Sequence, residues 1–380
     1  MTTRHIAFFS FPHFPHINPT LSLVATLIRR GHRVSYVTAD RFAANVTELG
    51  AEVLSCQDPL KLEGYPSSVV DWTIRIISDT AAFYEHNRPD LVVYDSMCHA
   101  GRIFAREQRI PAIQTSPAFA VNELEFTVQV PAVELRELIL EGDRRTDRLF
   151  EHRGIAKQNC EFHREALNIC FYPKAFELAG NEGDTTLFYA GRCAPERPYR
   201  QAWKSSSCSG RPLLIVSTST FYTQTADYFR MCIEALSGLK WHVVLAIGHN
   251  NDAAAFGPLP PHFEIVQNVP QIQILPYASM MICLGGMITT VEAMYHGVPL
   301  IMLTHGHPEP EWYGNTFEKL GLGIHIREHE TNVAALRSAV LRISESAEIA
   351  DGVRHMQRVV RKDSGGEETA NRIEDYLEQG

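Results

Sequence analysis

Short apolar runs alternate with amphipathic stretches along the first half of the chain. Runs of this length, bounded by turn residues, predict buried strands at residues 6–10, 33–38, 53–55 and 91–95. Between them, apolar residues recur at helical spacing, as in the stripe formed by Leu21, Leu23, Val24 and Leu27. Because strands alternate with helices, the pattern predicts an α/β fold with a parallel, doubly wound sheet.

The boundaries of the first helix are predicted from its cap residues. Asn18 is a favoured N-cap, and Pro19 would then occupy the first helical position. Gly31 suits the left-handed conformation that ends many helices. Ser10–Pro19 therefore joins the first strand to its helix, at the edge of the sheet where ligands bind in doubly wound folds.

The same pattern restarts after a polar stretch at residues 192–212 that is broken by proline, serine and glycine and is typical of a linker. Residues 120–167 are expected to be mostly helical. We expect three parts: a Rossmann-like domain at 1–200, a second Rossmann-like domain at 201–360, and a C-terminal helix at 361–380 that packs back on the first domain. In the second domain, strands are predicted at 213–217, 241–247, 263–267, 280–283 and 299–303, and helices at 226–237 and 287–295.

Composition narrows the class of protein. The chain has 380 residues, of which 45% are hydrophobic and 21% charged, and its net charge is −9. An acidic balance argues against nucleic acid as a partner. The sequence has neither an apolar run of 18 residues nor the pattern of a signal peptide, so we expect no membrane span. The eight cysteines show no metal-ligand spacing, which favours a reducing cytoplasm. Either a monomer or a homodimer fits these observations.

Two histidines and an aspartate lie at predicted strand ends. His13 and His16 follow the first strand and are candidates for a general base, while Asp95 ends the strand at 91–95. Asp95 would hold an imidazole in one tautomer, as an aspartate does in a catalytic triad. The alternatives stay open: a surface or locally bonded histidine, a metal shared by His13 and His16 for which no third ligand is indicated, and an N-cap role for Asp95.

A strand that ends in Gly285-Gly286 and turns directly into a helix is the most informative motif. Free N–H groups and the positive end of a helix favour an anion, usually a phosphate. Thr289 and Thr290 add hydroxyls to the first turn, and Glu292 lies one turn further on, where it would bond a ribose diol. The alternatives are a simple tight turn and a solvated glutamate.

Together these motifs resemble the macrolide glycosyltransferases of family 1, which have the GT-B fold: two Rossmann-like domains that face each other across a cleft. The resemblance extends over nearly the whole chain. It implies that the domain at 1–200 binds the acceptor, with residues 120–167 covering the acceptor pocket, and that the domain at 201–360 binds the nucleotide sugar. It is carried by the segments His16–Pro19, Arg30–Val34, Pro89–Asp95, Asn268–Gln271, Gly285–Met287 and Glu292–Pro299.

The resemblance implies roles for individual residues. His16 matches the general base of the family and Asp95 its partner. Acceptor contacts are expected from His13, Phe14 and Phe119. Donor contacts are expected from Ser219, Thr220, Asn268, Val269, Gln271, Gly285, Gly286, Met287, Thr289, Thr290, Glu292, Glu311 and Trp312. The co-substrate would be a UDP- or dTDP-linked sugar, with no further cofactor and no metal.

The chain also departs from the family, mainly on the donor side. Leu284 replaces a phosphate-binding histidine, and Ile288 replaces a polar residue in the same loop. Asn268 stands where many relatives stack a tryptophan on the base. Trp312 stands where a glutamine is usual, and residues 217–220 lack a glycine that lets the backbone approach phosphate.

These observations predict an inverting, metal-independent glycosyltransferase that acts on a hydroxyl of a hydrophobic natural product, such as a macrolide or phenolic compound. The altered donor loop leaves an alternative, a repurposed GT-B enzyme whose His16–Asp95 pair serves elimination, cyclisation or isomerisation without a sugar donor. A third reading is a non-catalytic partner or ligand carrier, for which His16 would be dispensable.

Overall fold

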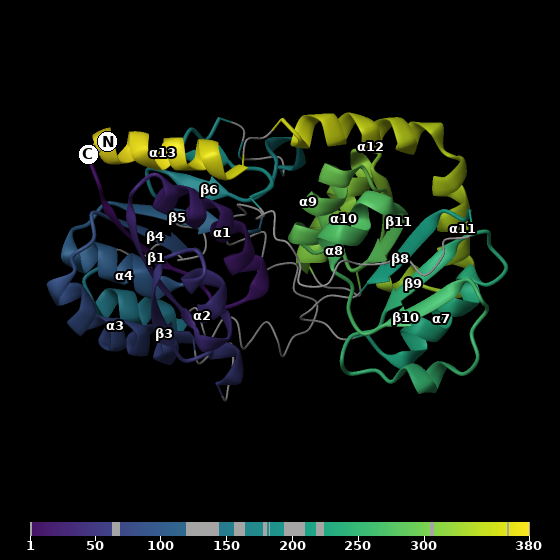
Figure 1. Ribbon diagram of the computed structural model, residues 1–380, viewed down its shortest axis with the longest axis horizontal. Helices are drawn as coiled ribbons and strands as arrows, with labels where there is room; N and C mark the ends of the chain where they lie inside the picture. Colours follow the sequence, from purple (N-terminus) through teal and green to yellow (C-terminus); the bar gives the residue numbers. More distant parts are fainter. Residues whose placement is uncertain are drawn as a thin grey trace. The chain divides into compact units, whose positions relative to one another are not determined.

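The chain folds into two compact units, and each contains one parallel sheet (Figure 1). The first unit comprises residues 1–196 and 363–380, and the second comprises residues 197–362. The computed structural model describes residues 2–62, 69–118, 144–155, 164–177, 181, 183–193, 210–217, 224–304, 308–362 and 365–379.

The first unit contains a seven-stranded sheet in the order β3-β2-β1-β4-β5-β6-β7. Its strands are β1 His5–Phe9, β2 Arg33–Ala39, β3 Glu52–Cys56, β4 Leu91–Asp95, β5 Ala112–Ser116, β6 Asn168–Cys170 and β7 Leu187–Tyr189. Its helices are α1 Phe14–Arg29, α2 Asp40–Thr47, α3 Val69–His86, α4 His99–Gln108 and α13 Gly365–Gln379. The strand order reverses between β1 and β4, which pair in parallel.

Alternate residues of β1 supply the two faces of this sheet. Ile6 and Phe8 join a core with residues of α1, α2 and α13, whereas Ala7 and Phe9 join a core with residues of α3 and α4. The strand therefore reads as a continuous apolar run, because both of its faces are covered.

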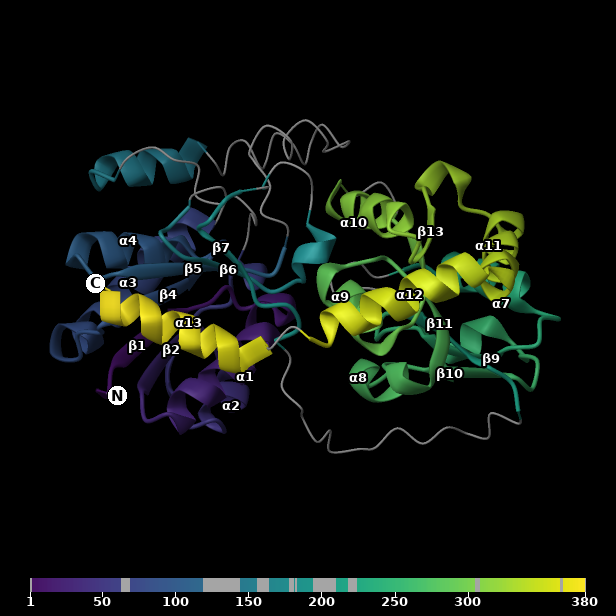
Figure 2. The ribbon, with the colours of Figure 1, turned by 90° about the horizontal axis from the view of Figure 1, so that it is seen from above.

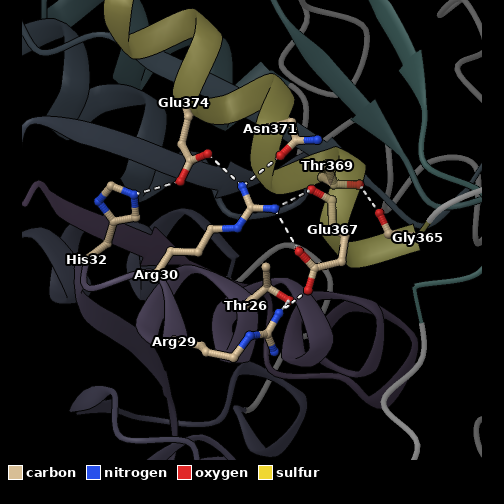
Figure 3. A network of polar contacts seen from close by, with 9 residues as sticks. All are labelled: Thr26, Arg29, Arg30, His32, Gly365, Glu367, Thr369, Asn371 and Glu374. Atoms are coloured by element: carbon tan, nitrogen blue, oxygen red, sulfur yellow. Dashed lines mark hydrogen bonds and ion pairs between the residues drawn. The ribbon is translucent and has the colours of Figure 1, made fainter. Parts of the chain in front are cut away.

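The C-terminal helix α13 packs along α1 in the first unit (Figure 2). Polar residues reinforce this contact (Figure 3): Arg30 donates to Glu374 at 2.6 Å and to Glu367 at 2.7 Å, and His32 Nε2 lies 3.0 Å from Glu374. The backbone N–H of Arg4 donates to His32 Nδ1, so the ring hydrogen lies on Nε2 and points to Glu374.

The second unit contains a six-stranded sheet in the order β10-β9-β8-β11-β12-β13. Its strands are β8 Leu213–Ser217, β9 His242–Ala246, β10 Phe263–Val266, β11 Ala278–Cys283, β12 Leu300–Leu303 and β13 Gly323–Ile326. Its helices are α7 Ala226–Leu236, α8 Gln271–Ile274, α9 Met287–His296, α10 Pro308–Lys319, α11 Val333–Glu345 and α12 Ala347–Val360. Here the strand order reverses between β8 and β11.

The prediction of two parallel, doubly wound sheets is confirmed. Within the region expected to be helical, residues 144–152 form a helix, and residues 119–143 and 156–163 lie outside the described residues. The sequence interpretation did not identify the helices α3, α8 and α10 or the strands β5, β6, β7 and β13.

Candidate active site

His16 lies in the first turn of α1, which begins earlier than the sequence predicted. The helix starts at Phe14, with His13 as N-cap, so Asn18 and Pro19 lie inside it and the predicted N-cap is wrong. The physical reason is Pro15, which is compatible with the first turn because N–H groups there have no intrahelical partner. The backbone N–H groups of His16 and Ile17 both donate to the His13 carbonyl at 3.0 Å.

A chain of hydroxyls secures this first turn. Pro19 has no N–H to donate to the preceding turn, which removes one helical hydrogen bond. Thr20 Oγ1 donates to the Ile17 carbonyl at 2.8 Å, and the Tyr36 hydroxyl lies 2.7 Å from both Thr20 Oγ1 and Ser10 Oγ. Since all three hydroxyl residues are buried, the end of β1, the start of α1 and β2 are held together at this point.

The segment between β1 and α1 is also held from α2. Arg41 Nε pairs with Asp58 at 2.8 Å, and an Arg41 N–H donates to the Pro12 carbonyl. The Phe11 ring meets the His16 ring edge-on, with centroids 5.3 Å apart. His16 is therefore held by backbone bonds and by an aromatic neighbour.

Asp95 at the end of β4 lies opposite His16. His16 Nδ1 is 2.9 Å and 3.0 Å from the two carboxylate oxygens of Asp95. The Asp95 side chain is 1% exposed and that of His16 is 12% exposed. Asp95 also accepts the Met97 N–H at 2.9 Å, while the N-cap of α4 is Cys98. The N-cap alternative for Asp95 is therefore wrong, and the strand reversal between β1 and β4 brings the predicted pair together.

His13 and Phe14 lie beside this pair. Burial, followed by the neighbouring His16 and Arg41, lowers the pKa of His13 to about 4, so this ring is neutral at physiological pH. Phe14 is 42% exposed, although it begins a helix whose other large apolar residues are mostly buried. These positions fit the expected acceptor contacts, which stay predictions. Phe119 lies outside the described residues.

The glycine turn of the second unit lies where β11 ends, beside the strand reversal. Gly285 has φ +87°, and a Cβ there would lie 2.7 Å from the Met302 sulfur, so both conformation and space require glycine. Gly286 is the N-cap of α9 and is exposed, with no side-chain cap. The first helical bond runs from the Thr290 N–H to the Gly286 carbonyl, so the N–H groups of residues 287–289 precede it.

The other predicted residues of α9 differ in their surroundings. Met287 is buried, and so is Thr290, whose hydroxyl donates to the Gly286 carbonyl. Thr289 is partly exposed and lies 3.3 Å from Gln271 Nε2. Gln271 Nε2 also donates to Glu292 at 2.6 Å, and Glu292 is only 4% exposed, so the alternative of a solvated glutamate is wrong.

The residues expected near the nucleotide base and the sugar follow other strands of the same sheet. Asn268 and Val269 come after β10, and the Asn268 amide lies 2.8 Å from His249 Nε2 in the segment after β9. Glu311 and Trp312 belong to α10. Leu284 is buried and presents no polar side chain to the turn. Ser219 and Thr220 lie outside the described residues.

Sequence reasoning missed two neighbours of these residues, His249 and His325. His249 belongs to no recognised motif. The sequence indicated only that it lies two positions beyond the strand predicted at 241–247. His325 lies within β13, a strand that the sequence interpretation did not assign.

Among the described residues, no group of three or more histidine, cysteine, aspartate or glutamate side chains is arranged to hold a metal ion. In the same part of the chain, no helix has the length and apolar character needed to cross a membrane.

Known proteins resemble the chain along its whole length. The family described as "Erythromycin biosynthesis protein CIII-like, C-terminal domain" matches residues 230–375. An NDP-glycosyltransferase of Bacillus licheniformis is 32% identical over 395 residues, which cover 99% of this chain and 98% of that protein. The solved structure of the kitacinnamycin glycosyltransferase has a TM-score of 0.87 and 27% identity, and covers 98% of each chain. A calicheamicin glycosyltransferase has a TM-score of 0.82 and 29% identity over 100% of this chain and 99% of its own.

Proposed function

The chain belongs to the GT-B glycosyltransferases that use nucleotide sugars, and we propose that it moves a sugar from a nucleoside diphosphate to a hydroxyl of a hydrophobic natural product. The observation that carries the proposal is the His16–Asp95 pair at the strand reversal of the first sheet. The family named for erythromycin biosynthesis and the solved glycosyltransferases named for kitacinnamycin and calicheamicin support the acceptor class.

His16 acts as the general base in this proposal. Asp95 faces Nδ1, so it accepts the Nδ1 hydrogen and leaves the Nε2 lone pair free to take the proton of the acceptor hydroxyl. The acceptor oxygen then attacks the anomeric carbon, and the bond from that carbon to the diphosphate breaks with its electrons on the phosphate oxygen. Because attack and departure occur on opposite faces of the carbon, the configuration inverts.

The departing diphosphate is stabilised at the glycine turn. The exposed Gly286 and the N–H groups of residues 287–289 offer donors at the positive end of α9, where negative charge is favoured. Thr289 adds a hydroxyl. Since the helix end meets the charge that develops, the proposed step needs no metal ion.

The ribose and the base would be held by neighbouring residues. Glu292, fixed by its bond with Gln271, has a carboxylate suited to the ribose diol, and the backbone at Val269 would meet the base. The name of the Bacillus licheniformis relative supports a nucleoside diphosphate donor, and we expect UDP or dTDP.

One observation favours a second candidate function. Leu284 is buried and apolar at a position where a polar side chain would reach phosphate. If the donor site binds no diphosphate, the His16–Asp95 pair would instead remove a proton in a donor-independent elimination, cyclisation or isomerisation.

Substitution of His16 and Asp95 tests the proposal. With UDP- or dTDP-glucose and a panel of macrolactone and phenolic acceptors, His16→Ala should lower kcat by about 10²–10⁴-fold. Asp95→Asn should lower kcat by about 10²-fold or more, because its amide N–H₂ favours the wrong tautomer. The exposed His86→Ala is the matched control and should leave kcat unchanged. Product mass and released nucleotide are measured; full activity of His16→Ala would refute the proposed base.

A further inference from the structure

A polar cluster in the second unit links a fully buried histidine to a glutamate with partial exposure. His325 lies on β13 and its side chain is 0% exposed, whereas the Glu311 side chain on α10 is 22% exposed. Thr304 directly follows β12 and lies between them, and it is fully buried. The cluster is thus built where β12 ends, on the edge of the sheet that also carries the glycine turn.

The hydrogen bonds of this cluster have a defined direction. The Thr304 hydroxyl donates to Glu311 Oε1, and His325 Nε2 lies 2.8 Å from Thr304 Oγ1 and 3.4 Å from Glu311 Oε2. A hydroxyl has one hydrogen, so when Thr304 donates to Glu311, the imidazole must donate to Thr304. Donation therefore runs from the buried ring through the hydroxyl to the carboxylate.

The surrounding chain accommodates the imidazole. A Cβ at Gly314 would lie 2.8 Å from two carbons of the His325 ring, so the glycine in α10 provides the space that the ring occupies. The other ring nitrogen, Nδ1, lies 3.1 Å from Asn315 Oδ1, an oxygen that also accepts from Arg327 at 2.9 Å. Nδ1 therefore donates as well, so the ring carries both hydrogens when Thr304 donates to Glu311. Burial lowers the pKa of His325 and the facing Glu311 acts in the opposite direction.

We propose that His325 is a positioning residue that, through Thr304, orients the Glu311 carboxylate to accept hydrogen bonds from the hydroxyls of the donor sugar. The proposal rests on the proposed function and adds to it a determinant of sugar recognition. Among the described residues, each carboxylate oxygen has one inward contact, and a carboxylate oxygen has further lone pairs that can accept from hydroxyl groups. Since the glutamate is already ordered, binding does not have to restrict its side chain.

If His325 only packed α10 against β13, its substitution would weaken the binding of the nucleotide and of the sugar nucleotide equally. Glu311 would contact the sugar and not the nucleotide, so the inference predicts a loss confined to the sugar nucleotide. His325→Ala should weaken the binding of UDP-glucose or dTDP-glucose about tenfold, while the Kd of UDP or dTDP changes less than twofold. Calorimetry with both ligands of a pair measures this difference.

Thr304→Val provides a second variant if His325→Ala does not fold. It removes the bridging hydroxyl with little change in shape and should cause the same selective loss. In a double-mutant cycle, His325→Ala should have no further effect once Glu311 is alanine, because the histidine acts through that carboxylate.

Two results would overturn the inference. One is an equal loss of affinity for the nucleotide and the sugar nucleotide, and the other is a His325→Ala effect that persists in the Glu311→Ala background. A different result is that the unsubstituted protein binds none of the four ligands: UDP, UDP-glucose, dTDP and dTDP-glucose. That result would refute the proposed function itself, and this inference with it.

Discussion

The position of His16 within α1 depends on which of two prolines occupies the first turn of that helix. Pro15 and Pro19 are one helical turn apart, and either can occupy a first turn. The sequence interpretation chose Pro19 because Asn18 is a good N-cap, but the helix begins at Phe14 without a side-chain cap. Buried hydroxyl contacts from Ser10, Tyr36 and Thr20 stabilise the earlier start, and such long-range contacts are not visible in a local pattern.

Gly285 supports a prediction at the scale of the residue. Gly285→Ala places a side chain at φ +87° and against Met302, so it should lower the free energy of unfolding by roughly 1–3 kcal/mol. Denaturant titration measures the change. Gly286→Ala is the matched control, because its φ is −62° and its Cβ would meet open space; an equal loss in both variants would contradict the assigned geometry.

At the scale of elements, the strands that carry the site were the most predictable from the sequence. The strand at Leu91–Asp95 matches its predicted bounds, because a continuous apolar run flanked by polar residues is unambiguous. The strands β6 and β7 each have three residues and were not identified, since runs that short have no periodicity. The positions of His16 and Asp95 at neighbouring strand ends followed from the parallel topology.

The contact between α13 and α1 supports a prediction at the scale of elements. Glu374 is 6% exposed and contacts both Arg30 and His32, so Glu374→Ala leaves these groups without their partner. The free energy of unfolding should fall by roughly 2–4 kcal/mol. Thermal and denaturant unfolding measure it.

Glu367 lies on the same helix, but its side chain is 56% exposed. Glu367→Ala should therefore change the free energy of unfolding little. If both variants lost the same stability, the buried part of the cluster would not be what holds α13.

At the scale of the whole molecule, the sequence predicted the architecture better than the donor site. Both sheets and the family follow from many motifs in a fixed order, whereas the donor site depends on a few positions that differ from the family. Leu284 and Asn268 could be recognised as replacements, but the contacts of Asn268 with His249 and of Glu311 with His325 required the fold.

Binding of a nucleoside diphosphate is the most direct test of this account. Calorimetric titration of the full chain with UDP and with dTDP should give a Kd in the micromolar range, about −8 kcal/mol. That result would show that α9 and its glycine turn hold a diphosphate without the histidine that Leu284 replaces. Absence of binding at millimolar concentrations of both nucleotides would contradict the transferase proposal and favour donor-independent chemistry at His16 and Asp95.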